Sequence, residues 1–148
     1  MIKVLCLHGF HNTSEVLEYM MKDFRKYFPE MSFDYMNAPL SSPVECSIDQ
    51  RARQIFPNIE KHYYWISYSD ATMVAKDENQ KFMQSLELCH KTIVDKINEK
   101  GPYDAILSFS EGGQILQTFL QRYEAGEFKD VIKKEGPKFV DRKSTRLN

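Results

Sequence analysis

Apolar residues along this chain follow two patterns, short continuous runs and longer stretches with helical spacing. The runs at 2–7 and 105–109 have the length of buried strands. Apolar residues recur every three or four positions over 14–28, 77–99 and 115–123, which predicts three amphipathic helices. Predicted strands and predicted helices therefore alternate along the chain.

The order of these elements indicates a fold class. A short strand is predicted over 33–38, and a further strand begins at 138–140. Strands that alternate with helices are typical of a doubly wound parallel sheet. The segment 39–76 is a long connection with an aromatic patch at 62–66, and a connection of this length is usually functional or disordered. We expect one α/β domain over 1–140, with a mostly parallel sheet and flanking helices.

Composition excludes several classes of function. The chain has 148 residues, a net charge of −1 and 42% hydrophobic residues, so it can bury one core and shows no bias toward nucleic acid. The first apolar run is too short for a signal peptide or a membrane span. No dinucleotide fingerprint follows that run and no metal-ligand spacing occurs, so we expect no cofactor, no metal, no nucleic-acid partner and no membrane partner. Oligomeric state stays open.

The three cysteines, Cys6, Cys46 and Cys89, are scattered and odd in number. This usage is typical of free thiols in a reducing compartment, so we expect a cytoplasmic protein.

The run at 105–109 leads directly into Ser110, Glu111 and a pair of glycines, and then into a predicted helix. A nucleophile elbow has this form, because a serine on a sharp strand-to-helix turn needs small neighbours. The motif departs from G-x-S-x-G at its first position, where Ser108 replaces glycine. The alternative is that Ser110 only caps a buried helix.

A second motif follows the first strand, where the chain reads His8-Gly9-Phe10-His11. In elbow enzymes, one oxyanion-hole amide belongs to the residue after the nucleophile and the other to a loop after an earlier strand. Glu111 and Phe10 are therefore the candidate backbone donors. Gly9 would allow the loop to approach the substrate, and His8 is expected to orient the loop by hydrogen bonding rather than to act as a base.

Four segments together resemble the serine hydrolases of the FSH group, within the α/β-hydrolase superfamily. They are 3–10, 37–39, 64–65 and 101–112. The resemblance implies a partial α/β-hydrolase fold and a catalytic serine at Ser110. The chain departs from the family pattern by having Asn37 for aspartate, Ser108 for glycine and Glu111 for glutamine. We expect the Glu111 side chain to point to solvent, since only its backbone amide is needed.

Aromatic residues of the long connection suggest a substrate pocket. The hypothesis is that Tyr64, Trp65 and Tyr68 wall an acyl-binding pocket over Ser110. The alternative is that these aromatic side chains only pack the connection onto the helices.

The triad of this fold runs in the order serine, acid, histidine, yet all four histidines of this chain precede Ser110. We therefore expect the acid and the histidine to be missing from a truncated chain. The basic segment 141–148 replaces a buried strand, so we expect a non-native tail; the alternative is a genuine solvated terminus.

The function expected from the sequence is hydrolysis of small-molecule carboxylic esters or thioesters through an acyl-enzyme on Ser110. In the present chain this activity should be nearly absent. The alternative is a non-catalytic α/β-hydrolase-like binding module.

Overall fold

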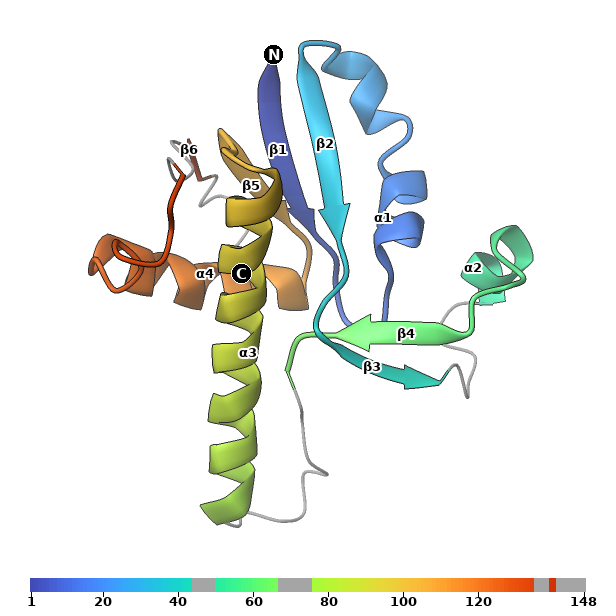
Figure 1. The fold of residues 1–148 in the computed structure, drawn as a ribbon. Coiled ribbons are helices and arrows are strands. Elements are labelled where there is room, and N and C mark those ends of the chain that lie inside the picture. Colours follow the sequence, from blue (N-terminus) through green and yellow to red (C-terminus); the bar gives the residue numbers. More distant parts are fainter. Residues whose placement is uncertain (44–49, 67–75, 135–138, 141–148) are drawn as a thin grey trace, which may run out of the picture.

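A computed structural model describes residues 1–43, 50–66, 76–134 and 139–140. Strands, helices and one 3-10 helix follow one another along the chain (Figure 1). In order they are β1 (Ile2–Leu7), α1 (Ser14–Met20), η1 (Phe24–Tyr27), β2 (Met31–Met36), β3 (Leu40–Pro43), α2 (Gln50–Ile55), β4 (Lys61–Tyr64), α3 (Lys76–Lys100), β5 (Ala105–Ser108), α4 (Glu111–Glu124) and β6 (Phe139–Val140).

The main sheet has four strands in the order β2-β1-β5-β6, and every neighbouring pair is parallel. The central strand β1 places Leu5 opposite Asp34 of β2 and opposite Ile106 of β5. Helices connect these strands, as the alternation of strand and helix patterns predicted. The predicted α/β class, with a mostly parallel sheet and flanking helices, is confirmed.

Successive side chains of β1 point to opposite faces of the sheet, so both faces carry a core. On one face, Leu5 and Leu7 belong to the larger apolar cluster, which includes residues of α3 and α4. On the other face, Val4 and Cys6 pack with residues of α1. The molecule therefore has three layers, with the sheet between α1 and the pair α3 and α4 (Figure 1).

Two parts of the structure differ from the sequence prediction. The helix expected over 14–28 ends at Met20, and a 3-10 helix follows at Phe24–Tyr27. The connection 39–76 was expected to be a loop, but its described part contains a two-stranded antiparallel sheet of β3 and β4. This small sheet lies across the carboxyl ends of β1 and β2 (Figure 1).

The direction of the connections changes between β1 and β5. The chain passes from β1 through α1 to β2 on one side, and from β5 through α4 to β6 on the other. In open α/β sheets, ligands bind at such a switch point, outside the carboxyl ends of the strands. The segments that leave β1 and β5 at this edge are the two motifs singled out in the sequence.

Candidate active site

Ser110 stands between the end of β5 and the first residue of α4. Its backbone has φ 48° and ψ −117°, a combination that residues with a side chain rarely adopt. The side chain is exposed and makes no hydrogen bond that caps the helix. The hydroxyl is therefore presented outward on a strained turn, directly over the amino terminus of α4, where the helix dipole favours negative charge.

Gly112 allows α4 to begin this close to the sheet. A Cβ atom at this position would lie 2.5 Å from the carbonyl oxygen of His8 and 3.0 Å from that of Leu7. Both contacts are backbone atoms of the central strand and its exit, so neither can move aside cheaply. The glycine after the candidate nucleophile is therefore required by close helix-to-strand packing.

The segment after β1 lies against Ser110. A Cβ atom at Gly9 would lie 3.4 Å from the Cβ atom of Ser110. Phe10 is 46% exposed, and its ring stacks on that of His11 with the centroids 3.8 Å apart. His11 has a φ of 45°, so this segment also contains a strained residue.

A bridge to the small sheet fixes the far end of the same segment. The amide of Asn12 donates to the carbonyl of Tyr63 at 3.1 Å, and the amide of Tyr63 donates back at 2.9 Å. Since Tyr63 belongs to β4, the loop after β1 is tied to a strand that the sequence did not reveal. Ring contacts add to this, because the ring of Tyr64 lies 5.7 Å from that of His11.

His8 is fully buried, and its hydrogen bonds determine its tautomer. The amide of Ala38 donates to Nε2 at 2.9 Å, so Nε2 carries no proton. Nδ1 then carries the proton and donates to the carbonyl oxygen of Gly9 at 2.6 Å. Burial lowers the pKa of His8, which keeps the ring neutral. The imidazole thus orients the loop after β1 and joins it to the end of β2.

The expectation that Glu111 points to solvent is wrong. The residue is only 4% exposed, and its carboxylate accepts hydrogen bonds from the amides of Ile66 at 3.1 Å and Trp65 at 3.5 Å. Burial raises the pKa of Glu111, and these two amides act in the opposite direction. The physical reason for the error is long-range: the two donors lie 45 and 46 residues away along the chain.

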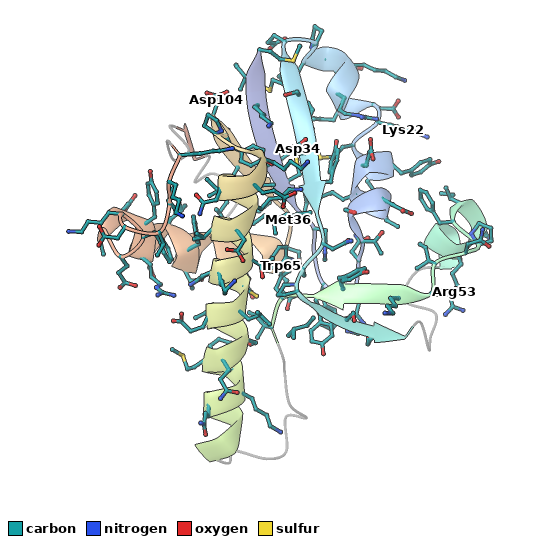
Figure 2. The ribbon with its side chains drawn as sticks, viewed as in Figure 1. Lys22, Asp34, Met36, Arg53, Trp65 and Asp104 are labelled. Carbon is teal, nitrogen blue, oxygen red and sulfur yellow. The ribbon has the colours of Figure 1, made fainter. Side chains whose placement is uncertain are left out.

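Trp65 is completely buried beyond the end of β4, beside α3 (Figure 2). Its indole Nε1 donates to the carbonyl of His8 at 2.8 Å, and its own carbonyl accepts from the thiol of Cys89. Of the two interpretations of Trp65, packing within the fold describes its position in this structure, since it has no exposed surface to line a pocket. Tyr64 is half-buried at the end of β4, and Tyr68 lies outside the described residues.

A polar pocket of about 250 Å³ lies close to the carboxyl end of β2. Its lining includes Thr13 and Ser14 at the start of α1, Asn37 after β2, and Lys61 and Tyr63 of β4. The lining of this pocket contains one aromatic residue, Tyr63.

The arrangement brings together an exposed serine on a strained strand-to-helix turn, a glycine-containing loop against it, and a sheet edge at a switch point. A family model described as serine hydrolase (FSH1) matches residues 1–140. The chain belongs to this serine hydrolase family. The resemblance expected from the four sequence segments is thereby confirmed.

Named relatives of this family member are esterases and hydrolases. Esterase C25G4.2 of Caenorhabditis elegans is 23% identical over 86% of this chain and 54% of that protein. Hydrolase phiM of Talaromyces stipitatus is 28% identical over 82% of this chain and 46% of that protein. Among solved structures, esterase PE8 matches with a TM-score of 0.50 and 19% identity, over 80% of this chain and 50% of that chain, which shows a shared fold. The chain spans about half the length of these relatives.

No histidine is hydrogen-bonded to the Ser110 hydroxyl within the described ranges of this family member. Both ring nitrogens of His8 are hydrogen-bonded elsewhere, to the backbone of Ala38 and of Gly9. His90 is buried on α3, where it contacts Thr118 and Arg122 of α4, and burial with the nearby arginine lowers its pKa to about 4. His11 and His62 contact one another edge to face across the loop after β1.

Other parts of this family member bear on the remaining expectations. Cys6 and Cys89 are free and buried, and burial raises the pKa of each thiol to about 12. Cys46 lies outside the described residues, as does the segment 141–148. Over the residues that the structure describes, no group of three or more His, Cys, Asp or Glu side chains could hold a metal ion. No helix in the same set of residues is both long and apolar enough to cross a membrane.

Proposed function

We propose that this protein is a serine esterase that forms an acyl-enzyme on Ser110. The observation that carries the proposal is the Ser110 backbone, with φ 48° and ψ −117°, at a helix start whose hydroxyl is not used for capping. Strain of this kind costs about 1–3 kcal/mol and persists where function requires it. A cap serving only stability would not need a strained backbone, so the geometry favours the nucleophile over the structural cap.

In the proposed reaction, Ser110 Oγ attacks the carbonyl carbon of a small-molecule carboxylic ester or thioester. A histidine takes the hydroxyl proton and then gives it to the departing alcohol or thiol. Water next attacks the acyl group by the same route, and the carboxylic acid leaves. The developing oxyanion would accept hydrogen bonds from the Phe10 and Glu111 amides, and one such donor is worth about 3 kcal/mol.

The acid and the histidine of the triad would come from sequence that follows residue 140 in a longer protein. Two facts support this part of the proposal. The triad order of the fold places both residues after the serine, and the relatives are about twice as long as the matched segment. The buried free thiols Cys6 and Cys89 support a reducing, cytoplasmic location.

Substrate contacts would come from the segments beside Ser110. Gly9 lies against the nucleophile, Phe10 follows Gly9 in the chain, and the ring of Tyr64 lies beside that of His11 on the same loop. His8 would contribute indirectly, by holding the loop through its bonds to Ala38 and Gly9. Trp65 would act in the same indirect way, because it is buried.

Covalent labelling tests the proposed nucleophile. A fluorophosphonate probe should phosphonylate the full-length protein on Ser110, as located by mass spectrometry, and Ser110→Ala should remove both labelling and ester hydrolysis. The 148-residue chain, with no histidine after Ser110, should retain at most the residual ~10³ to 10⁴-fold acceleration over water that oxyanion stabilisation and binding supply. Labelling at another residue, or hydrolysis that survives Ser110→Ala, would contradict the proposal.

A non-catalytic binding module is the second candidate, and one observation favours it. The buried carboxylate of Glu111 places a negative charge in the residue whose amide would stabilise the oxyanion. If the full-length protein neither reacts with the probe nor hydrolyses esters, this second function replaces the first.

A further inference from the structure

A buried hydrogen-bond network connects the two segments that leave β1 and β5. The indole of Trp65 donates to the carbonyl of His8, at the exit of β1. The amides of Trp65 and Ile66 donate to the carboxylate of Glu111, at the start of α4. His8 and Trp65 are completely buried and Glu111 nearly so. The pair Trp65 and Ile66 therefore bridges two segments that belong to different elements.

The two candidate oxyanion-hole amides lie on these same two segments. Phe10 follows His8 by two residues, and the other amide belongs to Glu111 itself. A tetrahedral oxyanion accepts hydrogen bonds from both amides only when each amide stays within about 0.5 Å of its productive position. Phe10 lies in the turn after β1, whereas Glu111 begins α4, so a buried connection between the two segments would fix the position of one amide relative to the other.

We propose that Glu111 and Trp65 are positioning residues, which hold the Phe10 and Glu111 amides at the spacing that the oxyanion requires. The inference rests on the proposed function, because it concerns the oxyanion hole of that reaction. It assigns the Glu111 side chain a role separate from that of its backbone amide. Trp65 takes part through its indole N–H and its backbone, without touching the substrate.

A third element holds the bridging pair in place. The thiol of Cys89, on α3, donates to the carbonyl of Trp65 at 2.8 Å. The Trp65 peptide is thus bonded on one side to α4 and on the other to α3, while its indole reaches the exit of β1. Movement of Trp65 would disturb all three contacts at once.

The carboxylate suits this role because it accepts two amide hydrogen bonds at once. A glutamine in its place keeps one carbonyl oxygen that can accept from Ile66, whereas a leucine accepts none. The three side chains are similar in size. Comparing them separates the loss of the hydrogen bonds from the loss of volume.

Steady-state kinetics of the full-length protein with p-nitrophenyl butyrate tests the inference. Glu111→Leu should lower kcat about tenfold or more with KM unchanged within about twofold. A misplaced amide loses its hydrogen bond to the oxyanion, and this bond stabilises the transition state more than the bound substrate. Glu111→Gln should retain kcat within about threefold. Trp65→Phe, which removes only the donor to His8 and part of the ring, should lower kcat in the same way. The control Glu99→Leu, at an exposed acidic residue near the end of α3, should leave both constants unchanged.

The outcomes distinguish this inference from the proposed function. If hydrolysis depends on Ser110 but Glu111→Leu and Trp65→Phe both keep the wild-type kcat, the positioning role is overturned and the nucleophile stands. If the loss appears in KM alone, the network shapes substrate binding instead and the positioning role is again overturned. If no hydrolysis depends on Ser110, both fail. Should Glu111→Leu fail to fold, Trp65→Phe decides the question, since it leaves the Glu111 carboxylate and its two amide donors in place.

Discussion

The starts of α1 and α4 use a side-chain hydroxyl in opposite ways. At the start of α1, Thr13 has φ −135° and ψ 161°, is 7% exposed, and accepts a hydrogen bond from Val16 N through its hydroxyl. At the start of α4, Ser110 has φ 48° and ψ −117°, is exposed, and makes no side-chain cap bond. One hydroxyl stabilises its helix, and the other is kept out of the helix on a strained backbone.

The difference shows how a stability cost can identify a chemical role. A relaxed cap typically contributes about 1 kcal/mol, and a residue in a rarely populated backbone region costs about 1–3 kcal/mol. The start of α4 therefore loses stability twice relative to the start of α1. Local rules are broken in this way mainly at functional sites, which is why Ser110 and not Thr13 is the proposed nucleophile.

The largest expected difference in stability between the two helix starts arises at the second residue of each helix, which is Gly112 in α4 and Glu15 in α1. Gly112→Ala would place a Cβ atom 2.5 Å from the His8 carbonyl oxygen, and should lower the free energy of unfolding by about 3 kcal/mol. Glu15→Ala, at the matching and exposed position of α1, should change it by less than about 0.5 kcal/mol. Urea denaturation of both variants measures the difference. Equal effects would mean that α4 does not require its close approach to β1.

The two cap residues themselves should respond unequally to alanine. Thr13→Ala removes the bond to Val16 N and should lower the free energy of unfolding by about 1 kcal/mol. Ser110→Ala removes no cap bond and should change it by less than about 0.5 kcal/mol. The same urea titrations provide the measurement. A loss of 1 kcal/mol or more for Ser110→Ala would restore the structural-cap interpretation.

Glycine at the same two positions sharpens the comparison further. Ser110→Gly relieves the strain of the positive φ, while the greater entropy of glycine in the unfolded chain acts in the opposite direction. The net result should be a rise of about 0.5–1 kcal/mol in the free energy of unfolding. Thr13→Gly relieves no strain at φ −135° and should lower it by about 0.3 kcal/mol. Thermal unfolding followed by circular dichroism should show shifts of opposite sign. Shifts of the same sign would argue against strain at Ser110.

The first residue of α4, Glu111, adds a pH dependence to the stability of the protein. Burial raises the pKa of Glu111 above its ordinary 4.5, so the folded state holds the proton more tightly than the unfolded state. Protonated Glu111 therefore contributes to the free energy of unfolding. This contribution is fully present below pH 4.5 and is lost as the pH rises through the raised pKa. Wild type should therefore lose stability relative to Glu111→Gln as the pH increases. Denaturation of both proteins from pH 4 to 8 tests this, and parallel curves would contradict it.

Much of the fold could be predicted because the relevant patterns are local. The apolar run that forms β1 and the helical spacing that forms α3 lie within single elements, and both match the structure closely. The predicted helix over 14–28 fails for a tertiary reason. Phe24 fits the helical spacing, but its ring packs against those of Phe28 and Phe33 from a 3-10 helix.

Prediction of the site divides in a similar way. The turn at Ser110 and the loop at Gly9 could be predicted from neighbouring residues, and the structure places them side by side. The burial of Glu111 depends on amide donors 45 and 46 residues away, and a charged residue is rarely buried, so the expectation of exposure was reasonable and wrong. The pairing of Asn12 with Tyr63 likewise depends on the small sheet of β3 and β4, which the pattern of apolar residues did not predict.

Trp65 is the only tryptophan in this chain, and it lies fully buried within the network between the two loops. Its intrinsic fluorescence therefore reports on one place in the molecule. Emission from an enclosed indole lies at shorter wavelength than emission from an indole in water, so any event that separates the exit of β1 from the start of α4 should shift the spectrum to the red. The chain carries its own optical reporter at the junction between the exit of β1 and the start of α4.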